Sequence, residues 1–135
     1  MTPTATWACP RFVEFVERGD VHSPELFAVA DDYLAPVRAA GVDTLVLGCT
    51  HYPLLTGVIS YVVGDHVTLV SSAEETAKDV YRALATHGLF RSDASPPPRH
   101  RFLATGDPAP FQQLGRRFLG PEVGEVGALE EVVCA

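Results

Sequence analysis

The chain has 135 residues, of which 47% are hydrophobic and 20% charged, a composition typical of one soluble globular domain and unlike that of a disordered chain. Its net charge is −7 and it contains no basic run, so the sequence predicts no nucleic-acid-binding surface. The apolar runs are far shorter than the ~20 residues of a membrane span, and the first residues lack the charged and apolar stretches of a signal peptide.

The first elements in chain order are expected to be a strand end and two helices. Residues 6–9 are short and apolar, as at the end of a strand. Pro10 and Gly19 favour a helix over 11–18, because proline suits the first helical position and glycine the position after the last. Ser23 followed by proline starts a second helix, which the apolar spacing carries to about Ala40, before Gly41. Pro36 is expected to kink or divide that helix.

A strand and helix alternation follows. Residues 44–48 form a continuous apolar run, typical of a strand that is buried on both faces of a parallel sheet. The pattern then predicts a helix from Pro53 to about Val63, a second strand at 67–70, and a helix from Ser71–Ser72 to about His87. In this last helix Glu74 and Glu75 complete a capping box. Strands alternating with helices predict an α/β fold, an open, mostly parallel sheet with helices on both faces.

The remainder of the chain begins with the clearest linker signal in the sequence, DASPPP at 93–98. A strand is predicted near 101–104, followed by a helix that Asp107 caps. Its predicted core face is spaced at helical intervals and consists of Phe111, Leu114 and Phe118. Residues 122–133 are only weakly patterned, and no internal repeat is present.

Cys49, Thr50 and His51 form the most informative segment. They come after a buried strand and before a predicted helix, at the sheet edge where open α/β proteins bind ligands. A helix N-terminus stabilises a thiolate, so Cys49 is a candidate reactive thiol. The Thr50 hydroxyl and free N–H groups suit an anionic ligand such as a carboxylate, and His51 is placed to act as an acid or electrostatic partner.

Plainer interpretations of this segment remain open. A free cysteine after a buried strand is commonly a small buried hydrophobe. Cys49 and His51 supply two metal ligands, but no second cluster of ligands accompanies them, so no metal site is predicted. The three cysteines, at 9, 49 and 134, are odd in number and far apart, which argues against a disulfide scaffold and favours a reduced, cytoplasmic compartment.

The amino-acid sequences of three segments are more specific than the spacing of their residue types. GVDTLVLGCTHYPLL at 41–55 resembles the second active-site motif of the glutamate racemases, ACPRFVEFVERG at 8–19 resembles a second stretch of that family, and VSSAEETA at 70–77 with ATGD at 104–107 resembles a third. The resemblance extends from about Ala8 to Gly120. The related aspartate racemases usually carry another residue at the position of His51, so this motif favours glutamate as the substrate.

The resemblance implies racemisation of glutamate by two cysteines without a cofactor, which supplies D-glutamate for peptidoglycan. One thiolate removes the α-proton from one face, and a second cysteine, as a thiol, donates a proton to the other. Cys49 matches the second cysteine, and Thr50 matches a residue that holds the substrate. His51 and Glu17 match groups that assist proton transfer at this cysteine, although Glu14 lies one turn from Glu17 on the same helix face.

Several other polar residues are given structural roles. Lys78 is the only lysine, and in EETAKDV it is expected to pair with Glu74 or Glu75 on the surface, so a Schiff base with pyridoxal phosphate is not expected. Cys9 is not at a catalytic position of the family, and Cys134 lies next to the terminus. The remaining histidines are expected on the surface: His22, His66, His87 and His100.

The first half of the family has no counterpart in this chain, neither its glycine-rich loop nor its first catalytic cysteine. The resemblance therefore implies one and a half domains of a two-domain fold, in which 1–70 belong to the second α/β domain and 71–135 return to complete the first. Such a chain is expected to be inactive alone. Two other functions remain open: a glutamate-binding or regulatory module without catalysis, and a hydrolase or acyl transferase with Cys49 as nucleophile. The chain could also form a homo-oligomer.

Overall fold

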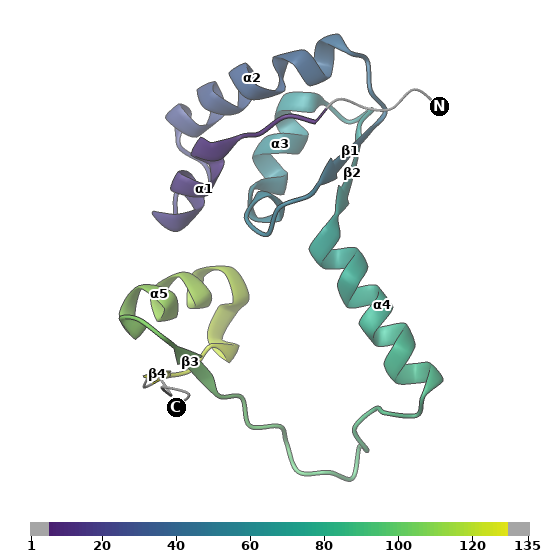
Figure 1. Ribbon diagram of the computed structural model, residues 1–135, viewed down its shortest axis with the longest axis vertical. Helices are drawn as coiled ribbons and strands as arrows, with labels where there is room; N and C mark the ends of the chain where they lie inside the picture. The colour runs from purple at the N-terminus through teal and green to yellow at the C-terminus, as the bar shows by residue number, and fades with distance from the viewer. Residues whose placement is uncertain (1–5, 130–135) are drawn as a thin grey trace, which may run out of the picture. The chain divides into compact units, whose positions relative to one another are not determined.

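The computed structural model describes residues 6–129 (Figure 1). The chain divides after Phe90 into two compact units, which we call the first and second units. The division falls just before the proline-rich stretch at 93–98 that the sequence predicts as a linker. No helix of the described residues has the length and apolarity that crossing a membrane requires.

The first unit contains four α-helices: α1 (Pro10–Glu17), α2 (Pro24–Ala39), α3 (Thr56–Val63) and α4 (Ser72–Thr86). The predicted start and stop signals of α1, α2 and α4 are confirmed. The Ser23 hydroxyl accepts a hydrogen bond from the backbone N–H of Leu26 at 3.1 Å, which satisfies a donor that the first turn of α2 leaves free. Gly19 and Gly41 follow α1 and α2 with φ of 72° and 61°, a left-handed conformation that favours glycine.

Two short strands lie side by side in the first unit, β1 (Thr44–Leu47) and β2 (Thr68–Ser71). They pair in parallel, with Thr44 opposite Thr68 and Leu47 opposite Ser71, and α3 lies between them in the chain. This is the predicted strand, helix, strand unit of an α/β protein, and the predicted fold class is confirmed.

The core of the first unit lies mainly among α1, α2 and α3. The buried side chains recur at helical spacing, as expected for helices with one apolar face. Among them are Phe12, Phe15 and Val16 on α1, Leu26, Leu34 and Val37 on α2, and Val58, Ile59 and Val63 on α3. Within β1 only Leu47 is buried.

Some predictions for the first unit are wrong. Residues 6–9 form no strand. Pro36 does not divide α2, because the proline lies in the last turn, where it removes one hydrogen bond, and the N–H of Ala40 still bonds its carbonyl at 3.0 Å. The strands are not buried on both faces, since Val46 is 63% exposed and β1 has only β2 beside it among the described residues.

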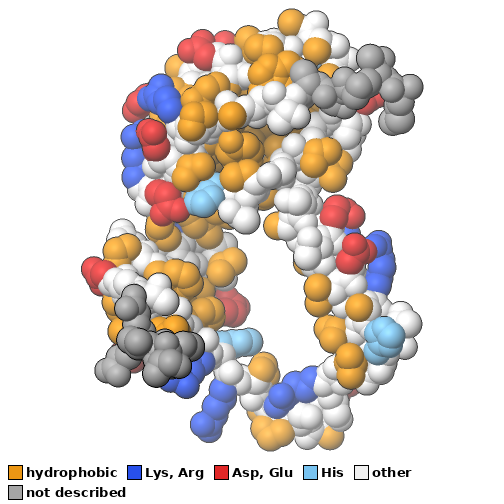
Figure 2. Space-filling view, in the orientation of Figure 1, with side chains coloured by type: hydrophobic (Ala, Val, Ile, Leu, Met, Phe, Trp, Pro, Cys, Tyr) orange, Lys and Arg blue, Asp and Glu red, His pale blue; other side chains and the backbone are white. Residues whose placement is uncertain are grey.

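Helix α4 carries no buried side chain, although its ends form as predicted. The Ser71 hydroxyl accepts the backbone N–H of Glu74 at 3.3 Å. Lys78 pairs with both Glu75 at 2.7 Å and Glu74 at 3.0 Å, which confirms its predicted surface role. Charged side chains gather along one side of α4 and hydrophobic side chains along the other (Figure 2).

The second unit contains β3 (Phe102–Ala104), α5 (Pro108–Leu119), a 3₁₀ turn at Gly120–Glu122 and β4 (Val126–Ala128). The strands β3 and β4 pair in parallel. Asp107 caps α5 as predicted, by accepting the N–H of Ala109 at 3.0 Å. The predicted core face of α5 is only partly formed, because Phe111 is 47% exposed while Leu114 and Phe118 are half-buried. The weakly patterned tail contributes a strand, which the sequence did not predict.

Candidate active site

The segment from Cys49 to His51 leaves the end of β1, as the sequence predicts. It leads into a 3₁₀ helix, η1 (Tyr52–Leu55), and α3 begins only at Thr56. The predicted α-helix starting at Pro53 is therefore wrong in its first turn. Because the field of a helix terminus falls off within about one turn, the dipole of α3, which begins at Thr56, acts only weakly at Cys49.

The sulfur of Cys49 has a local donor instead. The backbone N–H of His51 donates to Cys49 Sγ at 3.4 Å, and an N–H directed at sulfur stabilises negative charge on it. Cys49 is half-buried, whereas Cys9 is 5% exposed, and burial raises the pKa of the Cys9 thiol. The two cysteines thus differ in access, and burial disfavours the thiolate form of Cys9. Cys134 lies outside the described residues.

The imidazole of His51 is held on both sides. Its Nε2 lies 2.6 Å from Glu17 Oε1, and its Nδ1 lies 3.2 Å from the hydroxyl of Thr50. A proton on Nε2 suits this arrangement, because Nε2 then donates to the carboxylate and Nδ1 accepts from the hydroxyl. The two contacts together fix the orientation of the ring.

The contact with Glu17 separates two carboxylates that the sequence could not distinguish. Glu14 and Glu17 lie one turn apart on α1, and both side chains are exposed. Within the described residues it is the Glu17 carboxylate that bonds to His51, across 34 positions of sequence. The structure therefore brings Glu17, Thr50, His51 and Cys49 into one connected group and leaves Glu14 outside it.

Tyr52 is a residue that sequence reasoning missed. Its hydroxyl accepts the backbone N–H of Cys9 at 3.0 Å, and its ring meets the Phe12 ring edge to face with centroids 5.6 Å apart. Burial raises the pKa of Tyr52, so the hydroxyl stays protonated. No sequence signal connects Tyr52 with Cys9, 43 positions away.

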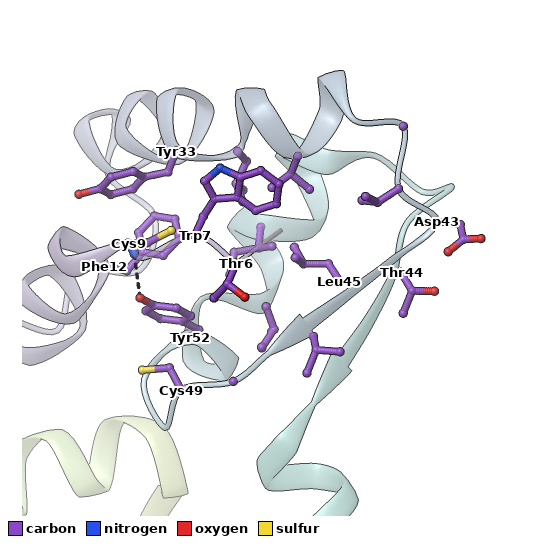
Figure 3. A pocket seen from close by; sticks show the side chains of 18 residues that line it. Thr6, Trp7, Cys9, Phe12, Tyr33, Asp43, Thr44, Leu45, Cys49 and Tyr52 are labelled. Carbon is purple, nitrogen blue, oxygen red and sulfur yellow. Dashed lines mark hydrogen bonds between the residues drawn. The ribbon is translucent and has the colours of Figure 1, made fainter. Parts of the chain in front are cut away.

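A groove of about 1030 Å³ runs along β1 beside these residues (Figure 3). Asp43 and Thr44 lie at one end, and Cys49 and Tyr52 lie at the other. Its lining is mainly apolar and includes Trp7, Leu45 and Val46. On the face of the first unit in Figure 2, hydrophobic side chains gather around a hollow. The groove thus combines exposed apolar side chains with a strand edge that pairs with no other strand of residues 6–129.

The other candidate groups lie elsewhere. Within residues 6–129, no cluster of three or more histidine, cysteine or carboxylate side chains could hold a metal ion. The amine of Lys78 is paired with Glu75, whose hydrogen bond raises the pKa of the lysine and so favours the charged form over the free amine that a Schiff base needs. As predicted, four histidines are exposed: His22, His66, His87 and His100.

Comparison with known proteins gives a consistent result. No family model matches the chain. The glutamate racemase of Acidothermus cellulolyticus is 64% identical over 124 residues, which are 92% of this chain and 47% of that protein. The structure of glutamate racemase from Thermus thermophilus with β-chloro-D-alanine is 40% identical, with a TM-score of 0.78, over 92% of this chain and 46% of that one. The Francisella tularensis enzyme with D-glutamate is 30% identical, with a TM-score of 0.77, over 90% of this chain and 45% of that one.

Sequence and fold together thus relate the chain to the amino-acid racemases. Within that class the similarity is to glutamate racemases, which confirms the resemblance drawn from the sequence motifs. The chain spans about half the length of the curated relatives that it matches.

Proposed function

We propose that this chain supplies the residues that transfer a proton at one of the two faces of glutamate in a glutamate racemase. The connected group of Glu17, His51 and Cys49 carries the proposal, because the backbone N–H of His51 bonds to the thiol sulfur while Glu17 orients its imidazole, in a chain 64% identical to a glutamate racemase. The substrate class follows from the neighbouring structures, one of which holds D-glutamate.

In the proposed reaction the Cys49 thiolate takes the α-proton from one face of glutamate and becomes a thiol. A second cysteine, supplied by the part of a racemase that this chain does not match, donates its proton to the opposite face and becomes a thiolate. Thr50 holds the substrate, and His51, oriented by Glu17, assists proton transfer at Cys49. In the reverse direction the two cysteines exchange roles.

The proposal includes the two domains predicted from the sequence. Residues 1–70 would be part of one α/β domain, and residues 71–135 would complete another. The groove along β1 would then receive further strands, since β1 pairs only with β2 among the described residues and Val46 is 63% exposed. We also propose a cytoplasmic location, in keeping with the free thiols of Cys9 and Cys49.

The test is a chimera in which the first half of the Acidothermus cellulolyticus relative precedes this chain. We expect the chimera to interconvert D- and L-glutamate, followed by circular dichroism, and the 135-residue chain alone to be inactive. Cys49→Ser should reduce the rate in both directions by about 10⁴-fold or more, because a serine hydroxyl is too weak an acid to replace a thiol base at neutral pH. His51→Asn should slow turnover with less effect on KM.

The matched control is Cys134→Ser, which makes the same chemical change at a cysteine to which the proposal gives no role and should leave the rate unchanged. A Cys49→Ser chimera with a near-normal rate would contradict the proposal. Exchange of the α-proton with solvent would distinguish a racemase from a hydrolase or acyl transferase, which would instead form an acyl adduct on Cys49. Glutamate binding without exchange would indicate a binding module.

A further inference from the structure

Helix α1 is bonded to the segment after β1 at both of its ends. At its start, the backbone N–H of Cys9 donates to the hydroxyl of Tyr52 at 3.0 Å. At its last residue, Glu17 bonds to His51 at 2.6 Å. Eight helical residues span about 12 Å, so two side chains that are adjacent in sequence reach opposite ends of one helix.

The hydroxyl of Tyr52 bonds where the helix itself provides no partner. The Cys9 side chain, at the N-cap position, makes no capping hydrogen bond. The N–H of Cys9 precedes the hydrogen-bonded turns of α1, and Tyr52 satisfies it in a partly buried position, where an unpaired donor is costly.

The packing around this bond is also specific. The ring of Phe12, which is 1% exposed, is met edge to face by Tyr52 on one element and by Tyr33 on another, with centroids at 5.6 and 5.4 Å. Tyr33 also directs its hydroxyl to a backbone N–H of α1, that of Arg11, at 3.5 Å. Tyr33, however, lies on α2 and not on the segment that carries His51.

We propose that Tyr52 is a positioning residue, which holds α1 in register with the turn so that Glu17 reaches His51. This inference rests on the proposed function of His51. Without the Tyr52 hydroxyl, α1 keeps its buried Phe12 and Phe15 but loses the bond at its start, and the carboxylate at its far end is no longer fixed. Hydrogen bonds weaken steeply with misalignment, so small rotations of α1 suffice to release the imidazole.

The experiment measures the Glu17–His51 interaction directly in the 135-residue chain. Glu17→Gln, His51→Asn and the double variant are compared by urea unfolding at pH 6 in three backgrounds, wild type, Tyr52→Phe and Tyr33→Phe. With side chains 58% and 29% exposed, the pair should change the unfolding equilibrium constant by a coupling factor of about three. We expect that factor to fall to near one in Tyr52→Phe and to remain about three in Tyr33→Phe.

A second measurement does not depend on a complete unfolding transition. The His51 Nε2 proton, assigned by its loss in His51→Asn, should exchange with water faster in Tyr52→Phe than in wild type or Tyr33→Phe. An unchanged coupling factor and exchange rate in Tyr52→Phe would overturn the proposal, and so would equal losses in both tyrosine variants or no coupling in wild type. Racemase activity enters neither measurement, so a failure of the proposed function leaves this test intact.

Discussion

The stretch from Cys9 to Val67 and the stretch from Thr68 to Leu129 bury their hydrophobic side chains very differently. In the first, α1, α2 and α3 bury most of their apolar faces, and Phe12, Leu55 and Ile59 are each 1% exposed. In the second, as far as the structure describes it, only Val123 and Val126 are buried. Both stretches nevertheless contain capped helices and parallel strands.

This difference separates local from non-local causes of structure. The caps at Ser23, Ser71 and Asp107 form in both stretches, because each needs only a backbone N–H two or three residues away. Burial needs a partner from elsewhere in the chain, and α4 leaves Val80 and Tyr81 53% and 64% exposed. An apolar helix face therefore indicates that a partner is expected, without identifying it.

The largest expected effect compares two phenylalanines. Phe12→Ala should lower the free energy of unfolding by about 3–5 kcal/mol, since it leaves a cavity beside two tyrosine rings. Phe111→Ala, at a position 47% exposed, should change it by at most about 0.5 kcal/mol. Urea unfolding monitored by circular dichroism measures both. Equal losses would mean that α5 is covered in solution and would remove the distinction between the stretches.

Much of the fold could be predicted from the sequence, because its signals are short-range. The glycines after α1 and α2, the serine and aspartate caps and the parallel strand pattern all depend on residues within a few positions of one another. The burial of β1 could not be predicted, since its apolar run is compatible with two covered faces but does not specify what covers Val46. The strand β4 was missed because its three residues carry too little pattern.

The second prediction compares a buried thiol with a half-buried one beside the same groove. Cys49 should be alkylated roughly tenfold faster than Cys9 near pH 7.5, because Cys9 is buried and its burial raises the pKa of its thiol. Mass spectrometry of peptides after timed alkylation separates the two rates, and that of Cys134 as well. Equal rates for Cys9 and Cys49 would show that the core around Cys9 opens readily.

The candidate site was only partly readable in the sequence. Cys49, Thr50 and His51 share a turn because they are consecutive, and the strand before them places that turn at the end of β1. The partner of His51 depends on how α1 is rotated about its axis, so the choice between Glu14 and Glu17 required the structure. The bond from Cys9 to Tyr52 likewise results from packing across 43 positions.

The third prediction uses the two serine caps. Ser23→Ala should cost about 1 kcal/mol in global unfolding, because α2 carries buried residues and its first turn must form for them to pack. Ser71→Ala removes the same kind of bond from α4, which buries nothing, and should increase amide hydrogen exchange in the first turn of α4 without moving the main transition. Identical shifts of the main transition would contradict this distinction.

The smallest effect concerns Asp20, which precedes α2 in the well-packed stretch. Hydrogen bonds from the Ser23 hydroxyl and from the backbone N–H groups of Ser23 and His22 lower the pKa of the Asp20 carboxyl to about 2. The folded-state pKa thus lies below the ordinary value of 3.8. The carboxylate therefore contributes its stability above about pH 4 and loses it as the pH falls toward 2.

Asp20→Asn should consequently lower the free energy of unfolding at pH 7 by roughly 0.5–1 kcal/mol, a modest value because the side chain is partly exposed to solvent. The difference from wild type should shrink progressively between pH 4 and pH 2 and vanish below it, as wild type also loses the charge. Asp32→Asn, on an exposed position of α2, removes the same charge and controls for its general effect. Urea unfolding at pH 7, 4, 3 and 2 measures the difference, and a constant deficit across that range would mean that Asp20 acts through the shape of its turn rather than through its charge.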